Sequence, residues 1–149
     1  MNATKTDRML GVTLIEMLVV LVLIGVLMAV VLPSYKDNVR KSARAAARGA
    51  LMDVSMRQQQ YFLNNKSYAT SLAGLGLPDP YFIDGTNEAV GSSDSSRLYK
   101  LTLANASATA YDAVATAVLD QTEDGCGNFT LKSDGARAVS GLAGAAVCW

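Results

Sequence analysis

Residues 12–32 form an apolar run of 21 residues that contains a single charged side chain, Glu16. An α-helix rises about 1.5 Å per residue, so this run would reach across the roughly 30 Å hydrocarbon core of a bilayer. The run is too long and too apolar to be the amphipathic face of a helix in a soluble domain. An ionised carboxylate in hydrocarbon costs about 3 kcal/mol unless it is paired or protonated. The sequence therefore predicts one membrane-spanning helix whose Glu16 requires a specific partner.

The ten residues before Gly11 carry Lys5 and Arg8 against one acid, Asp7. Positive charge beside a single span places that end of the chain in the cytoplasm, so the rest is predicted to lie outside the membrane. The end of the apolar run, Ala-Val-Val-Leu-Pro33, has no convincing small-x-small cleavage site of a secretory signal. Any cleavage is therefore predicted before the run.

A basic leader ending in Gly11, followed by Val-Thr-Leu-Ile-Glu16 and an apolar helix, resembles the processing signal of type IV prepilins. The resemblance implies that prepilin peptidase cleaves after Gly11, that Val12 becomes the methylated N-terminus and that Glu16 is the acid of the mature chain. Many members of the family have Phe at the position of Val12.

Cleavage would also supply a partner for Glu16. The new ammonium on Val12 of one subunit could meet Glu16 of another subunit in a stack of helices. We therefore expect Glu16 to be an assembly determinant that sets axial register. The alternative is that Glu16 lies near the membrane interface and snorkels to water.

Pro33 removes one helical N–H and crowds the preceding turn, so we expect a kink there in a helix that continues to about Phe62. The second half of this helix has apolar residues at steps of three and four. They predict a core-facing side made of Tyr35, Val39, Ala43, Ala46, Ala50 and Val54.

The opposite side of the same helix is basic, and we expect it to be solvated. Asp37 and Asp53 are candidate i,i+4 partners for Lys41 and Arg57. Binding of nucleic acid or lipid headgroups is the less favoured role for this side, because the formal net charge of the chain is zero. The basic residues are Arg40, Lys41, Arg44, Arg48 and Arg57.

After this helix the sequence changes first in composition and then in the period of its apolar residues. Residues 64–96 are rich in Gly, Ser, Asn, Asp and Pro, which predicts a surface connection with little regular structure. Residues 98–103 and 111–119 then alternate with a period of two, and Phe129 and Leu131 continue that pattern. The turn signal Ser133-Asp134-Gly135 predicts a hairpin that returns through residues 136–140. These three or four strands predict an α+β fold, with a small antiparallel sheet packed on the helix.

Cys126 and Cys148 are the two cysteines of the chain, and both follow the span on its outer side. An oxidising compartment favours joining them, so we predict a disulfide. The acidic cluster of Asp120, Glu123 and Asp124 lacks the regular alternation of a calcium loop and is better explained as a turn cap. We therefore predict no metal site and no cofactor.

The chain has no histidine, no Gly-rich phosphate loop and no Gly-x-Ser-x-Gly elbow. The usual nucleophile and general-base arrangements are therefore missing, and we predict that the protein is not an enzyme.

The segment from Arg57 to Tyr68, the segment from Cys126 to Gly135 and the final Cys148-Trp149 resemble PilE-type minor pilins. The resemblance implies the pilin fold and a minor subunit of a type IV pilus that helps to initiate assembly, with motility, adhesion or DNA uptake downstream. Such a subunit lies in the bacterial inner membrane with its C-terminal domain in the periplasm, and later in an extracellular pilus. The implied segments are a leader (1–11), a membrane and assembly half of the helix (12–33), an amphipathic half (34–63), an αβ-loop (64–96) and a disulfide-bonded sheet region (97–149).

The implied partners are major and minor pilins contacted through the N-terminal helix, prepilin peptidase, the inner-membrane assembly machinery and, before assembly, membrane lipid. Nucleic acid is the less favoured partner. Two alternatives stay open. One is an adhesive or binding subunit that recognises DNA or a surface, and the other is a pseudopilin of a type II secretion system.

Overall fold

The computed structural model describes residues 13–149, apart from the side chains of residues 30, 32 and 33. The predictions for Gly11 and Val12 lie outside the described residues. Contacts divide the chain into two units, Met1–Asp37 and Asn38–Trp149. We call Asn38–Trp149 the sheet unit.

A single helix, α1 (Leu14–Asn65), runs through both units. Within the part of the chain that the structure describes, α1 is long and apolar enough to cross a membrane. Each large apolar side chain described between Leu14 and Val31 is at least 44% exposed. The helix continues through residue 33, and the kink at Pro33 stays a prediction. The first half of α1 therefore has no core of its own to pack on.

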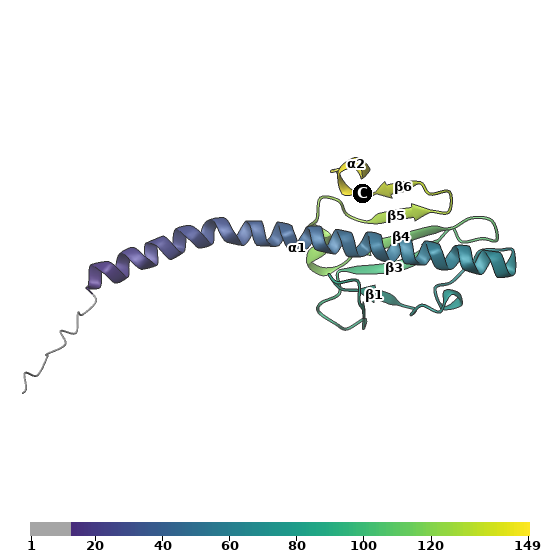
Figure 1. Cartoon of the computed structure of the whole chain (residues 1–149), viewed down its shortest axis with the longest axis horizontal. Helices are drawn as coiled ribbons and strands as arrows, with labels where there is room; N and C mark the ends of the chain where they lie inside the picture. Colours follow the sequence, from purple (N-terminus) through teal and green to yellow (C-terminus); the bar gives the residue numbers. More distant parts are fainter. Residues whose placement is uncertain (1–12) are drawn as a thin grey trace, which may run out of the picture. The chain divides into compact units, whose positions relative to one another are not determined.

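The sheet unit contains the second half of α1 and one antiparallel six-stranded sheet in the order β2-β1-β3-β4-β5-β6 (Figure 1). This confirms the predicted α+β class. The strands are β1 (Tyr81–Ile83), β2 (Ala89–Val90), β3 (Tyr99–Ala104), β4 (Asp112–Ala117), β5 (Phe129–Lys132) and β6 (Arg137–Val139); the short helices are η1 (Ala73–Leu75), η2 (Leu119–Glu123) and α2 (Ala145–Cys148).

The core lies between one face of the sheet and one side of α1. Alternate residues of each long strand are buried, as period-two patterning requires, and the largest fully buried rings are Tyr99, Tyr111 and Phe129. Small side chains on α1 let the helix approach this layer closely. The buried residues of α1 are Ala43, Ala46, Ala47, Ala50, Leu51, Val54 and Gln58.

The predicted core side of α1 is correct from Ala43 onward and wrong before it. Tyr35 is 67% exposed and Val39 is 41% exposed. The helical period continues in the sequence beyond the part of α1 that core residues cover, so spacing alone misplaced these two side chains.

Residues 64–96 contain three short elements that the sequence analysis did not identify, η1, β1 and β2. The last two are strands of only three and two residues, which is too short for an alternating pattern to be visible in sequence. The predicted β5–β6 hairpin is confirmed, with Gly135 in the left-handed region at φ 86°.

Gln58 ties the start of the loop after α1 to the helix. Its Nε2 donates to the Ala69 carbonyl at 2.9 Å, and its Oε1 accepts from the Ala69 N–H at 2.9 Å. Both residues are buried, with Gln58 at 0% and Ala69 at 2% exposure. Buried backbone groups need hydrogen-bond partners of this kind. The amide group of Gln58 is therefore expected to contribute more to stability than the volume that its side chain fills.

We expect Gln58→Leu to lower the free energy of unfolding by about 3 kcal/mol, because it leaves the buried N–H and C=O of Ala69 unpaired. Urea denaturation measures this change. Gln60 is exposed two positions later on the same helix and is the matched control: Gln60→Leu should change stability by less than about 0.5 kcal/mol. Equal effects of the two substitutions would contradict the role assigned to the Gln58 amide.

Candidate functional site

Glu16 lies in the first turn of α1, beside the first described residues of the chain. Its backbone N–H donates to the Thr13 carbonyl at 3.1 Å and lies 3.3 Å from Thr13 Oγ1, so Thr13 helps to cap the helix start. Glu16 is exposed, and the three ion pairs found within residues 13–149 do not include it. The chain therefore presents an apolar helix with one carboxylate whose charge is not neutralised by the described residues.

The arginines of the basic side of α1 are bonded within the chain, which corrects the expectation of a solvated face, whereas Lys41 is exposed as expected. Arg40 pairs with Glu123 at 2.8 Å, and Arg48 donates to the carbonyls of Cys148 and Trp149 at 3.1 and 3.0 Å. Arg57 forms the predicted i,i+4 pair with Asp53 at 2.9 Å. These arginines fasten the helix to itself and to the C-terminal region.

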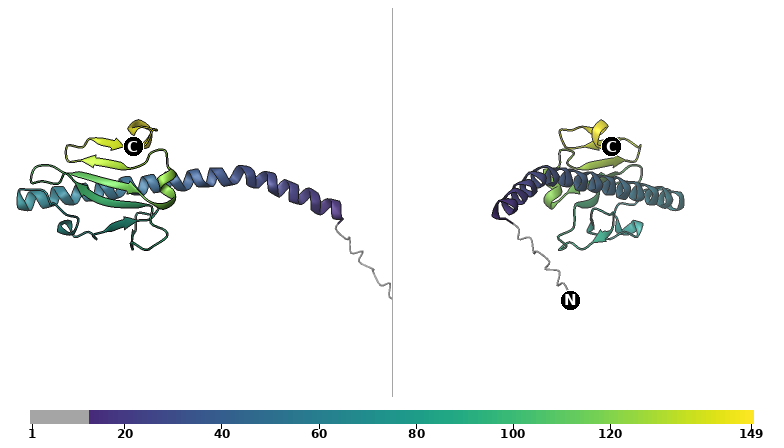
Figure 2. Two further views of the ribbon diagram at one scale, coloured as in Figure 1. Left: turned by 180° about the vertical axis from the view of Figure 1, so that it is seen from behind. Right: turned by 60° about the vertical axis from the view of Figure 1, so that its left-hand side comes forward.

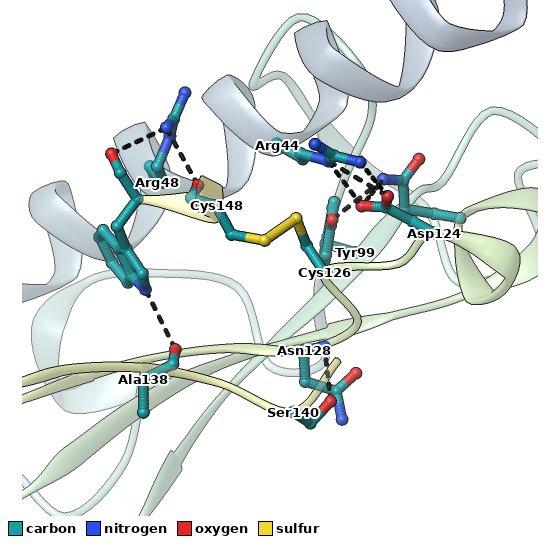
Figure 3. The surroundings of a disulfide bond; sticks show 11 residues. Arg44, Arg48, Tyr99, Asp124, Cys126, Asn128, Ala138, Ser140 and Cys148 are labelled. Carbon is teal, nitrogen blue, oxygen red and sulfur yellow. Dashed lines mark hydrogen bonds and ion pairs between the residues drawn. A yellow bond between two sulfur atoms is a disulfide. The ribbon is translucent and has the colours of Figure 1, made fainter. Parts of the chain in front are cut away.

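Arg44 belongs to a buried polar network in the sheet unit (Figure 3). Its Nε donates to Asp124 Oδ2 at 2.9 Å, and its Nη2 pairs with Asp124 Oδ1. The Asp124 side chain is 1% exposed and that of Arg44 is 22% exposed. Gln121 Nε2 then donates to Asp124 Oδ2 at 3.0 Å and to the hydroxyl of Tyr99 at 3.1 Å. Because these groups satisfy one another, the network can stay buried.

Burial raises the pKa of Tyr99 to about 12; the hydrogen bond from Gln121 opposes the increase, and the Asp124 carboxylate adds to it. The Tyr99 hydroxyl therefore stays protonated well above neutral pH. Asp124 and Glu123 are both bonded to arginines, so two members of the acidic cluster that also contains Asp120 are held in ion pairs.

The predicted disulfide between Cys126 and Cys148 is confirmed. The two Cα atoms are 5.8 Å apart, the sequence separation is 22 residues, and both cysteines are buried. Two hydrogen bonds near the disulfide hold the same segment. Trp149 Nε1 donates to the Ala138 carbonyl at 3.0 Å (Figure 3). The Gly141 N–H donates to the Cys126 carbonyl at 3.0 Å. The C-terminal region is thus covalently and non-covalently joined to the sheet and to α1.

The left view of Figure 2 shows the sheet from the side turned away from α1. This face carries a cluster that the sequence analysis did not identify. The Arg97 Cζ and the Lys100 Nζ each lie 5.9 Å from the centroid of the Phe82 ring. Lys100 alternates with the buried Tyr99 and Leu101, so its outward position was readable from sequence. Phe82 was not, because β1 has only three residues.

Two family models match the chain. The prokaryotic N-terminal methylation motif matches residues 7–32, which include Gly11, Val12 and Glu16. The model described as type IV minor pilin ComP, DNA uptake sequence receptor, matches residues 33–130, more than half of the chain. No curated protein matches the chain.

The methylation motif and the apolar first half of α1 fit a membrane-anchored pilin that later joins a pilus. A type IV minor pilin interacts with other pilins and with prepilin peptidase. The sequence-based prediction of a minor pilin is confirmed: the chain belongs to the ComP family of type IV minor pilins.

Proposed function

We propose that the chain is made as a prepilin in the bacterial inner membrane, is cleaved by prepilin peptidase between Gly11 and Val12, and is methylated at Val12. The assembly machinery then moves it into the pilus, where α1 packs against the helices of other pilins. As a minor subunit it helps to start assembly and performs no catalysis. The observation that carries this proposal is the first half of α1, which is apolar, exposed along its described length and includes an unneutralised Glu16.

Glu16 supplies the register in this proposal. An unpaired carboxylate among apolar helices is costly, and a charge-assisted bond to the Val12 ammonium of another subunit removes that cost. The pairing holds only when the helices are staggered by a fixed amount, so one ion pair can select one axial offset. Lipid covers the same apolar surface before assembly.

The test is the amount of protein recovered in sheared filaments relative to the amount in the membrane. We expect Glu16→Gln, which keeps the size and removes the charge, to lower incorporation about tenfold or more, as loss of a buried charge partner does at other interfaces. Asp37→Asn, which removes an exposed acid farther along the same helix, is the matched control and should incorporate normally. Normal incorporation of Glu16→Gln would refute the pairing.

A second function follows from the family description. The ComP model, whose description names a DNA uptake sequence receptor, matches residues 33–130 and so covers most of the sheet unit. We therefore propose that the sheet unit binds DNA while α1 holds the subunit in the filament. The basic side of α1 is a poor candidate for this contact, because its arginines are engaged inside the chain.

A further inference from the structure

We propose that the sheet unit binds one neutral sugar ring in a cavity between the last turns of α1 and the short helix η1. This site goes beyond the proposed roles in assembly and in DNA binding. The cavity has a volume of about 180 Å³ and is completed on the η1 side by Gly74 and Leu75. We call it the amide pocket, and the α1 residues that line it are Arg57, Gln60, Tyr61, Asn64 and Asn65.

Helical spacing gathers the polar groups of the amide pocket on one side of α1. Starting from Arg57, the lining residues follow at steps of three and four along the helix. Residues with this spacing are neighbours on the surface of an α-helix. The last two turns of α1 therefore present a guanidinium, three amides and a phenol to the same cavity.

The η1 wall of the amide pocket is fixed to α1 and to its own loop. Arg57 Nη1 donates to the Leu75 carbonyl at 3.3 Å, and Leu75 is buried at 8% exposure. The N–H of Gly76 donates to the Ala73 carbonyl at 3.0 Å, and Gly76 adopts φ 71°, which ends η1. The pocket is thus formed before a ligand arrives, so binding does not have to order this wall.

Several polar groups of the amide pocket have no partner inside the chain. The side-chain amides of Gln60 and Asn64 and the hydroxyl of Tyr61 make no hydrogen bond to another residue within 13–149. Asn65 Nδ2 donates to the Tyr61 carbonyl at 2.9 Å, which leaves Asn65 Oδ1 as an acceptor. Gln60, Asn64 and Asn65 are exposed, so their amides can turn toward a ligand from solvent.

The charge and chemistry of these groups favour a neutral ligand. Among the described residues that line the amide pocket there is no carboxylate and no lysine, and the charge of Arg57 is offset by its ion pair with Asp53 at 2.9 Å. Each side-chain amide offers N–H donors and a carbonyl acceptor, and hydroxyl groups both donate and accept hydrogen bonds. The expected ligand is therefore uncharged and rich in hydroxyl groups.

The size and the apolar surface of the amide pocket favour a single sugar ring. Sites for drug-sized ligands have volumes of about 300 Å³ or more, so this cavity suits a smaller ligand. Tyr61 and Leu75 supply apolar surface for the C–H groups of a sugar ring. A nucleobase is less favoured, because Tyr61 is the only aromatic residue that lines the pocket in the described part of the chain. The ring can belong to a free sugar or to the last residue of a surface glycan.

The test uses the full chain in dodecylphosphocholine micelles, whose head groups contain no sugar. Methyl glycosides of glucose, galactose, mannose and N-acetylglucosamine are titrated, and binding is followed by saturation-transfer difference NMR. We expect at least one glycoside to bind with a Kd of about 1 mM, because a ligand of about a dozen non-hydrogen atoms reaches only modest affinity. Immobilised oligosaccharides that end in the same sugar distinguish the two sources: retention of the chain assigns a surface glycan, and binding of the glycoside alone assigns a free sugar.

The double variant Gln60→Ala/Asn64→Ala should weaken sugar binding about tenfold or more, because it removes two hydrogen-bonding side chains from the amide pocket. Gln59→Ala/Asn38→Ala is the matched control. It removes the same two kinds of amide from exposed positions of α1 that do not line the pocket, and it should bind the sugar like the wild-type chain. Thermal melting checks that both variants are folded.

Three results would overturn the proposal. The first is that no glycoside binds the wild-type chain at concentrations well above the expected Kd. The second is that deoxyadenosine, titrated in the same way, binds more tightly than every glycoside. The third is that the two double variants lose the same affinity. Each of these results leaves the roles proposed in assembly and in DNA binding untouched, because those roles do not depend on Gln60 or Asn64.

Discussion

Gly141→Ala is expected to destabilise the sheet unit by at least about 3 kcal/mol, the cost of forcing atoms into a site with no space. A Cβ at residue 141 would lie 2.1 Å from the Gly125 carbonyl oxygen and 2.5 Å from the carbonyl carbon of Cys126. These neighbours are backbone atoms beside the disulfide, so no flexible side chain can move aside to relieve the clash.

Thermal or urea unfolding of the oxidised protein measures this cost. Gly91→Ala is the control, because a Cβ there would meet nothing within 4 Å. Its effect should be within about 1 kcal/mol of zero, since alanine also lowers the entropy of the unfolded chain. A Gly141→Ala protein as stable as wild type would show that the Cys126 segment packs differently from the arrangement described above.

The second large effect is expected for Asp124→Ala, which should lower the free energy of unfolding by about 3 to 5 kcal/mol. The substitution removes the buried carboxylate that accepts from Arg44 and from Gln121. Arg44 then keeps a charge that is about three-quarters buried after losing its ion pair with the Asp124 carboxylate.

The adjacent Glu123→Ala provides an internal comparison. It breaks the Arg40 pair, in which the Glu123 side chain is 77% exposed, and exposed pairs contribute only about 0.2 to 1 kcal/mol. The loss in the free energy of unfolding is therefore expected to be severalfold larger for Asp124→Ala than for Glu123→Ala, although both acids pair with an arginine. Similar effects of the two substitutions would mean that the Asp124 pair is not buried in solution.

Most of the elements predicted correctly from sequence have a pattern that extends over many consecutive residues. The apolar run and the helical spacing from Ala43 to Val54 gave α1, and the alternation around β3 and β4 gave the centre of the sheet. The Ser133-Asp134-Gly135 turn predicted the hairpin. The position of both cysteines on the outer side of the predicted membrane span predicted the disulfide. Each of these signals depends on neighbours along the chain or on compartment chemistry.

The features that were not predicted from sequence depend on contacts between residues that are distant along the chain. β1 and β2 are strands only because β3 provides an edge for them, and Phe82 meets Lys100 only through that register. Arg40, Arg44 and Arg48 were predicted to lie on a solvated face because their partners are 80 or more residues away in the sequence, as with Arg44 and Asp124. Helical spacing identifies which side of a helix a residue occupies, but it does not identify what packs there.

Glu16 was recognisable from sequence for the opposite reason: a carboxylate inside a bilayer-length apolar run is anomalous by itself. The structure adds that its charge is not offset by described residues of its own chain. Its partner must then come from outside residues 13–149, which the proposal assigns to the Val12 ammonium of another subunit.

The most direct test of this account is the N-terminal mass of the protein recovered from sheared filaments. The account predicts a subunit that begins with N-methylated Val12 and is present in the filament fraction. A chain that keeps residues 1–11, or one that stays in the membrane and never appears in filaments, would contradict it.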